Sequence, residues 1–143
     1  MRKATICFLL ISCSVIAFGQ QQPQWTTVAS VVLFNQTQGI SEAPLLTPTE
    51  PGIYRLNFYF SGRGTERGEQ HFFTARMNYV DIEGDKFDYT GIVFCSESAV
   101  FSMPPMMISL KPNVPLTYLL SLSNPSTARC HYNLAITVEQ LVQ

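Results

Sequence analysis

The strongest constraint in this sequence is an alternation of apolar and polar side chains with a period of two residues. In the segment 54–61 every second residue is aromatic or aliphatic, namely Tyr54, Leu56, Phe58 and Phe60. Successive side chains of a β-strand point to opposite faces, whereas a helix needs a period near 3.6. The segment is therefore predicted to form a strand with one buried and one solvent-facing side.

The same alternation, or a strand-like composition, recurs along the chain. The other predicted strands are 25–34, 71–80, 87–95, 99–111, 116–123 and 132–139. The polar segment 35–42 is predicted to be a connection, and Gly84 centres a predicted hairpin turn. Pro104-Pro105 interrupts one strand, and because prolines remove ladder donors, an edge or a corner is expected there. Short strands joined by turns predict an all-β protein, an antiparallel β-sandwich with jelly-roll topology.

Residues 1–19 are predicted to be a cleaved signal peptide. Arg2 and Lys3 give a positive start, a short apolar run follows, and Ala17 and Gly19 place small residues before the cleavage point. The apolar run is too short for a membrane span of about 20 residues, and no later segment qualifies. The chain is therefore expected to be secreted or periplasmic.

Two alternatives for the N-terminal segment stay open. The run Leu10-Ile11-Ser12-Cys13 resembles the lipobox of bacterial lipoproteins, in which Cys13 would carry a lipid anchor. The apolar run could also be a core strand, although it lacks alternation. After cleavage, 20–24 is expected to be a flexible polar lead and 25–143 a single domain.

Cleavage also changes the charge and the cysteine content. Removing 19 of the 143 residues leaves 124, and the loss of Arg2 and Lys3 moves the formal net charge from −1 to −3. Cys95 and Cys130 remain, and an even number of cysteines in an exported chain predicts a disulfide. Closing that loop would stabilise the fold by about 3–4 kcal/mol. Two buried free thiols are the alternative.

Composition excludes two classes of protein. Aromatic residues make up 12% of the chain and charged residues only 13%, which is the opposite of the pattern in disordered proteins. Nucleic-acid-binding proteins normally carry a basic excess. The slight negative charge therefore argues against a nucleic-acid partner.

Two segments are similar to the jelly rolls of the tumour necrosis factor and complement-head superfamily. In 46–58 an apolar residue precedes a short turn, after which Pro51-Gly52-Ile53-Tyr54 opens the alternating aromatic strand. In 108–118 two alternating runs flank a tight turn. There Asn113 stands in place of the family's Gly and also tolerates a positive φ, while Val114 replaces the family's Asp. The chain thus resembles a small exported bacterial member of this superfamily.

This resemblance implies a jelly roll that assembles as a homotrimer and binds proteins or glycans without catalysing a reaction. In the family, aromatic side chains near the threefold axis bury against their symmetry mates. Tyr59, Phe72 and Tyr118 are the candidates for such an oligomer interface here. The alternative is that each belongs to the ordinary core of one chain.

One group of acidic residues flanks Gly84. Its members are Asp81, Glu83, Asp85 and Asp88. Carboxylates at this spacing can supply oxygen ligands to Ca²⁺. The spacing does not match the known calcium-loop motif, and a solvated hairpin is the usual reason for such a run. No other cofactor is expected.

The segment 61–70 is the candidate binding loop, because polar surface loops often carry specificity. Its charged side chains are Arg63, Glu66, Arg67 and Glu69. His71 and His131 have no partner at zinc spacing and are interpreted as structural or surface residues. Asn35-Gln36-Thr37 is a glycosylation sequon that matters only in a eukaryotic source.

Three functions follow from these observations. The first is an exported, non-enzymatic binding or assembly module. The second is a lectin-like carbohydrate-binding domain, with or without calcium. The third is a small exported hydrolase, which needs a concave pocket holding a carboxylate or a histidine with a perturbed pKa. No G-x-S-x-G nucleophile motif occurs in the chain, so an enzyme is not expected.

Overall fold

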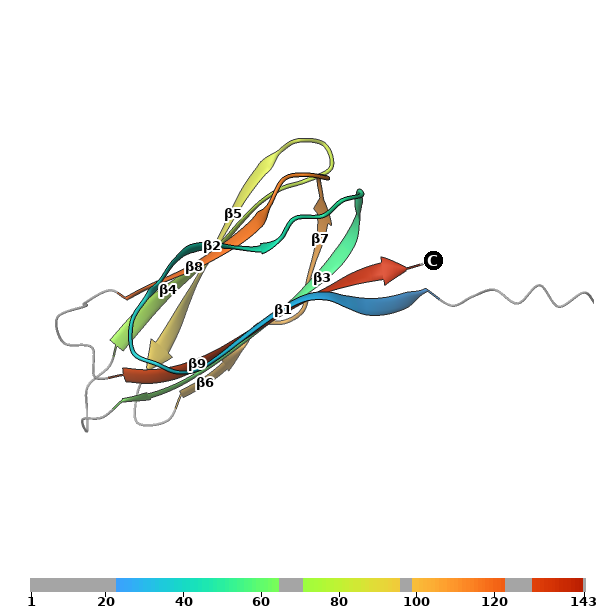
Figure 1. Ribbon diagram of the computed structural model, residues 1–143. Helices are drawn as coiled ribbons and strands as arrows, with labels where there is room; N and C mark the ends of the chain where they lie inside the picture. The colour runs from blue at the N-terminus through green and yellow to red at the C-terminus, as the bar shows by residue number, and fades with distance from the viewer. Residues whose placement is uncertain (1–22, 65–70, 96–98, 123–129, 143) are drawn as a thin grey trace, which may run out of the picture.

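The computed structural model describes residues 23–64, 71–95, 99–122 and 130–142, and these residues form nine β-strands in two layers (Figure 1). The strands are β1 (Gln24–Gln36), β2 (Ile40–Leu46), β3 (Gly52–Gly64), β4 (His71–Val80), β5 (Lys86–Cys95), β6 (Ala99–Ser102), β7 (Met106–Leu110), β8 (Leu116–Leu122) and β9 (Cys130–Val142). Within these ranges, no helix has the length and apolar character needed to cross a membrane.

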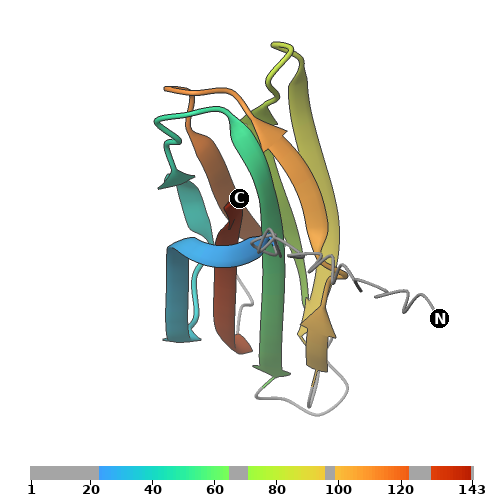
Figure 2. The ribbon, with the colours of Figure 1, turned by 90° about the vertical axis from the view of Figure 1, so that its right-hand side faces the viewer.

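Two antiparallel sheets make up the two layers. The first sheet has the order β1-β9-β3-β6, with β7 also pairing with β3, and the second has the order β2-β8-β4-β5. β1 and β2 lie at one side of the sandwich, and β5 and β6 lie at the other (Figure 2). The prediction of an all-β antiparallel sandwich is confirmed.

The alternation seen in the sequence fills the space between the sheets. Its buried members on β3 and β9 are Tyr54, Leu56, Phe58, Phe60, Tyr132, Leu134, Ile136 and Val138. β4 and β8 supply Phe73, Ala75, Met77, Leu116, Tyr118 and Leu120 from the opposite sheet. Burying one large apolar side chain contributes about 1.5–3 kcal/mol. Burial of these two facing sets of side chains is therefore the main contribution that holds the two sheets together.

Tyr132 is the polar exception in this core. Its ring stacks on Phe60 with centroids 5.4 Å apart and meets Phe73 edge-on at 4.9 Å. Burial raises the pKa of Tyr132 to about 12, because the ionised phenolate would lose its hydration. The hydroxyl therefore stays protonated and donates to the carbonyl oxygen of Gln38, which ties the β1–β2 connection to the core.

The prediction was wrong for part of the segment 35–42. The structure has a strand there, β2, which begins at Ile40 and pairs with β8 at the edge of the second sheet. Its register is irregular around Ala43 and Pro44. An edge strand donates hydrogen bonds from only one side, so it tolerates a proline and needs no strict alternation. Because an edge strand tolerates such a sequence, β2 lacks the alternation from which the other strands were predicted.

The predicted interruptions agree with the structure. Pro104-Pro105 separates β6 from β7, and both short strands pair with β3, so the break lies at the edge of the first sheet. The β4–β5 hairpin turns at Gly84, whose φ is +103°. Asn113 has a φ of +61° in the β7–β8 turn, in line with the positive φ expected there.

The predicted disulfide between Cys95 and Cys130 is present, with 6.2 Å between the Cα atoms. It joins the end of β5 to the start of β9 and therefore links the two sheets. Both cysteines are fully buried. Gly62 lies against this bridge, and a Cβ atom added there would be 3.0 Å from the Cys95 Sγ and 3.0 Å from the Phe60 ring. A side chain at that place would require the disulfide or the Phe60 ring to shift by a few tenths of an ångström.

We expect Gly62→Ala to lower the free energy of unfolding by roughly 1–3 kcal/mol, because the added Cβ would press on the disulfide and on the Phe60 ring, which is packed against Phe73 and Tyr132. Urea unfolding of the oxidised protein measures the change. Gly91→Ala is the matched control, since its added Cβ would contact only the Tyr89 ring at an ordinary 3.7 Å. Equal stability losses in the two variants would contradict the prediction.

Candidate functional site

A polar depression opens on the outer face of the first sheet, next to the disulfide. Strands β1, β3, β6 and β9 contribute to it, and its volume is about 530 Å³. Its polar lining consists of Asn35, Ser61, Arg63, His131 and Asn133. The remaining wall is formed by Gly62, Ala99 and Val100.

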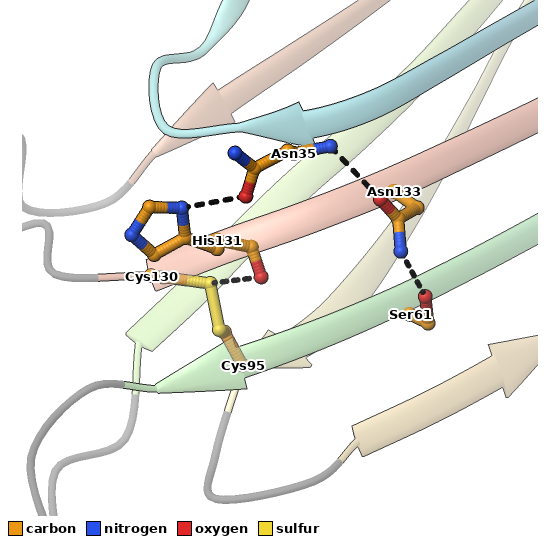
Figure 3. The surroundings of a disulfide bond; sticks show 6 residues. All are labelled: Asn35, Ser61, Cys95, Cys130, His131 and Asn133. Atoms are coloured by element: carbon orange, nitrogen blue, oxygen red, sulfur yellow. Dashed lines mark hydrogen bonds between the residues drawn. A yellow bond between two sulfur atoms is a disulfide. The ribbon is translucent and has the colours of Figure 1, made fainter.

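Hydrogen bonds connect four of these side chains in a single chain across three strands (Figure 3). Asn133 Nδ2 donates to Ser61 Oγ over 3.1 Å, and Asn133 Oδ1 accepts from the backbone N–H of Asn35 over 2.9 Å. Asn35 Oδ1 lies 2.8 Å from His131 Nδ1. Because a carbonyl oxygen can only accept, His131 Nδ1 carries the proton and Nε2 is left for a ligand or for water.

The backbone of Asn35 makes this arrangement possible. Its φ is +53°, a conformation that asparagine adopts more readily than most residues. The β1–β9 register shifts between Leu33 and Gln36, so Asn35 sits on an irregular part of the strand. Its backbone and its side chain can therefore bond to different residues of β9.

Arg63 contributes the positive charge of the depression. It lies on β3 directly opposite His131 of β9 in the strand register and is exposed. Within the described residues its guanidinium has no hydrogen-bond or ion-pair partner. Arg63 is the one charged residue of the predicted binding loop that the structure describes. The other three, Glu66, Arg67 and Glu69, lie outside the described residues.

A second polar cluster lies further along the same outer face. Arg55 Nε donates to Glu139 Oε2 over 2.7 Å, and Asn57 Nδ2 donates to the same oxygen over 2.9 Å. The Arg55 guanidinium also lies over the Trp25 ring, 4.6 Å from its centroid. The hydrogen bond from Arg55, followed by that from Asn57, lowers the pKa of Glu139. The two opposite charges cancel within this cluster.

Next to the depression, which Val100 also lines, the outer face is apolar. Four side chains there are between 42% and 70% exposed: Val32, Phe34, Tyr59 and Val100. The register places Val32, Ala135 and Tyr59 in one row across β1, β9 and β3. These four exposed residues form the apolar patch. Tyr59 was predicted from the sequence as an interface candidate.

The other two interface candidates lie elsewhere. Phe72 is exposed on the outer face of the second sheet, where its ring meets Phe94 with centroids 5.1 Å apart. Tyr118 requires a correction, because it is only 7% exposed and lies in the core between the sheets. Its position in the alternation of β8 is the inward one, as the neighbouring Leu116 and Leu120 also show. Tyr118 is therefore not part of an exposed surface.

The acidic turn brings together three of the four predicted metal ligands. Oxygen atoms of Asp81, Glu83 and Asp85 lie within 4.8 Å of one another. Asp81 Oδ1 already accepts from the backbone N–H groups of Gly84 and Asp85, both over 2.8 Å. The fourth candidate, Asp88, is separate and accepts from Thr90 Oγ1 instead. Asp81 therefore stabilises the turn itself.

Most residues that line the depression could not be recognised as site residues from the sequence. His131 was interpreted as a structural or surface residue, Asn35 was noted only as a sequon, and Ser61 and Asn133 carried no signal. Arg63 was selected as part of the segment 61–70, of which the described residues 61–64 form the end of β3. The buried His71, at 6% exposure, lies on the core side of β4 and does not line the depression. The signal that could have found the site is the outward phase of β9, which holds His131 and Asn133.

Comparisons with known proteins do not identify the function of this site. No family model and no curated protein matches the chain. A solved structure of the infectious bursal disease virus Gt strain matches 85% of this chain at 10% sequence identity, with a TM-score of 0.25. The chain spans 42% of the length of that viral chain. Similarity at this level supports no conclusion about function.

We expect Glu139→Gln to lower the Tm at pH 7, because the amide replaces a carboxylate that binds Arg55 and Asn57. The folded state lowers the pKa of Glu139 below 4.5. Its stabilisation is therefore present above the unfolded pKa and is lost as the pH falls through the lowered value. The Tm difference between the variant and the parent should shrink from pH 7 to pH 3. Glu50→Gln, an exposed carboxylate whose side chain accepts from no described donor, is the control, and a difference that grows on acidification would refute this account.

The acidic turn gives a separate prediction. A calcium ion present at ten times its Kd would stabilise the fold by about 1.4 kcal/mol. We expect the same Tm in calcium and in EDTA, because Asp81 is engaged by backbone donors and Lys111 Nζ lies beside Gly84. Differential scanning fluorimetry measures the Tm in both buffers. A calcium-dependent rise that disappears in Asp85→Asn would contradict the expectation and establish a metal site.

Proposed function

We propose that this protein is an exported, non-enzymatic assembly and binding module with a jelly-roll fold, which forms a homotrimer through the outer face of its first sheet. The observation that carries the proposal is the apolar patch of Val32, Phe34, Tyr59 and Val100. Exposed apolar surface that is continuous across several strands is typical of protein–protein contact sites.

The order of the strands supports the jelly-roll part of the proposal. β1, β3, β6, β7 and β9 belong to one sheet, and β2, β4, β5 and β8 belong to the other. The chain thus crosses repeatedly between the layers, as a jelly roll does when it is built from two Greek keys. The sequence resemblance around Pro51-Gly52 and Asn113 points to the same fold.

Charge supports the choice of the first sheet as the contact surface. The apolar patch lies beside the Arg55–Glu139 pair, whose opposite charges cancel. The cores of protein interfaces are depleted in unpaired charge and enriched in aromatic residues such as Tyr59. The four residues of the apolar patch carry no charge, so the same patch of a second copy would meet little electrostatic repulsion there.

Export is supported by the disulfide and by the predicted signal peptide. The bridge between Cys95 and Cys130 is a bond that persists in oxidising compartments. The signal peptide 1–19 lies outside the described residues, as does most of the predicted lead, whose last residue, Gln24, begins β1. The disulfide and the predicted signal peptide both favour a secreted or periplasmic location.

No pair of catalytic groups supports the hydrolase alternative in the described part of the depression. Its lining residues there include no carboxylate. Within the described residues the hydroxyl of Ser61 donates to no histidine or carboxylate and only accepts from the amide of Asn133, whereas a nucleophile would have to donate to a base. The binding alternatives are therefore the better supported ones.

The assembly is tested by light scattering of the exported chain during size-exclusion chromatography. The parent is expected to have three times the mass of one chain, and the double variant Val32→Ser/Tyr59→Ser is expected to have the mass of one. Ile92→Ser is the matched control, because it removes an exposed apolar side chain from the outer face of the other sheet. A monomeric parent, or a control that dissociates as fully as the double variant, would overturn the proposal.

A further inference from the structure

We propose that the polar depression binds the carboxylate of an acidic sugar, with Arg63 holding the carboxylate and Asn35 and His131 holding the hydroxyl groups. The inference goes beyond the proposed assembly and does not depend on it, because the ligand-facing side chains belong to a single chain. It assigns a ligand class to the site at the end of the first sheet.

The charge of the depression selects an anion. Arg63 is exposed, has no hydrogen-bond or ion-pair partner within the described residues, and lines the depression. No described lining residue is acidic. A guanidinium presents parallel N–H groups that match the two oxygens of a carboxylate. One positive charge also balances one carboxylate, whereas a phosphate monoester carries close to two negative charges at neutral pH.

The neutral side chains select a ligand with hydroxyl groups. His131 Nδ1 is held by Asn35 Oδ1, which fixes the ring orientation, and in the neutral ring His131 Nε2 is an acceptor. Asn35 Nδ2 has no partner within the described residues and is a donor. A hydroxyl both donates and accepts, so a vicinal pair of hydroxyls satisfies both groups at once.

The hydrogen-bond chain supplies rigidity to these two ligand-facing groups. Asn133 is engaged on both sides of its amide, by Ser61 and by the backbone of Asn35. It therefore positions Asn35, and one of its amide N–H groups and its amide oxygen are already engaged within the protein. A site whose side chains are already oriented loses less conformational entropy on binding.

The shape and the apolar wall fit a sugar ring. Val100 and Ala99 form the wall on the β6 side, where the C–H groups of a pyranose can pack. The volume of about 530 Å³ lies within the range of about 300–1,000 Å³ that is common for small-molecule sites. A monosaccharide unit with its carboxylate therefore fits without rearrangement of the strands.

Titration of the oxidised, exported chain with glucuronate, followed by NMR chemical shifts, tests the proposal. Glucuronate is expected to shift the resonances of the depression, and glucose at the same concentration is expected to leave them unchanged. Arg63→Gln should weaken glucuronate binding by about 10- to 100-fold, because it removes a charged hydrogen-bond donor pair. Arg76→Gln, an exposed arginine on the other sheet, is the control and should bind like the parent.

Asn35→Asp is a second variant, chosen because it keeps the acceptor for His131. It should weaken binding by repelling the carboxylate, and circular dichroism should show an unchanged fold.

An oligogalacturonate that binds more tightly than glucuronate would identify a polysaccharide as the source of the acidic sugar, and equal affinities would identify a free sugar.

Four outcomes would overturn the proposal. They are the absence of shifts with both glucuronate and oligogalacturonate, equal binding of glucose, equal competition by inorganic sulfate, and an unaffected Arg63→Gln variant. The Val32→Ser/Tyr59→Ser variant separates this result from the assembly test. Its substitutions lie outside the depression lining, so a monomeric form should still bind glucuronate.

Discussion

Burial of one face of β9 is the constraint on which the rest of this structure depends. Tyr132, Leu134, Ile136 and Val138 all point into the sandwich, so β9 can pair with β1 and β3 in only one phase. A slip of one residue would move this whole set to the solvent side. The same phase determines that Asn133 and Glu139 point outward, and thus where both polar clusters of the outer face lie.

The end of the sandwich near the disulfide joins core and surface most closely. Gly62 leaves room for the Cys95 side of the bridge, and its sequence neighbours Ser61 and Arg63 line the depression. On the core side, the Tyr132 ring packs against Phe60 and Phe73. The backbone that carries the ligand-facing side chains is therefore held by a covalent bond and an aromatic cluster. A site on such a base can remain oriented without a ligand.

The two outer faces of the sandwich differ in character. The first sheet presents a compensated ion pair, a row of apolar side chains and a hydrogen-bonded depression, all within a few strand positions. The second sheet presents the aromatic pair of Phe72 and Phe94, and its β4–β5 turn carries the acidic residues. Assembly and ligand binding are proposed for the same sheet, so the boundary between the apolar patch and the depression, where Val100 lies, is the place where they would influence each other.

Much of the fold could be predicted from the sequence, because period-two alternation reports directly on which side chains are buried. The strands that pack on both sides of the core showed it clearly, and the turns at Gly84 and Asn113 were predicted by residues that tolerate a positive φ. β2 was missed, since an edge strand with Pro44 obeys no such pattern. Tyr118 was misplaced because an aromatic residue in an alternating strand has the same signal whether its face is core or interface.

The candidate site could not be predicted from the alternation of apolar and polar residues. The sequence by itself determined the sandwich class, the buried faces and a pair of cysteines able to bridge. Only the tertiary structure decided that Asn35, Ser61, Arg63 and His131 meet at one place. These residues lie on strands that are distant in the sequence, and their meeting depends on the register of β9 against β1 and β3. Register follows from the packing of the whole core, so no local pattern reveals it.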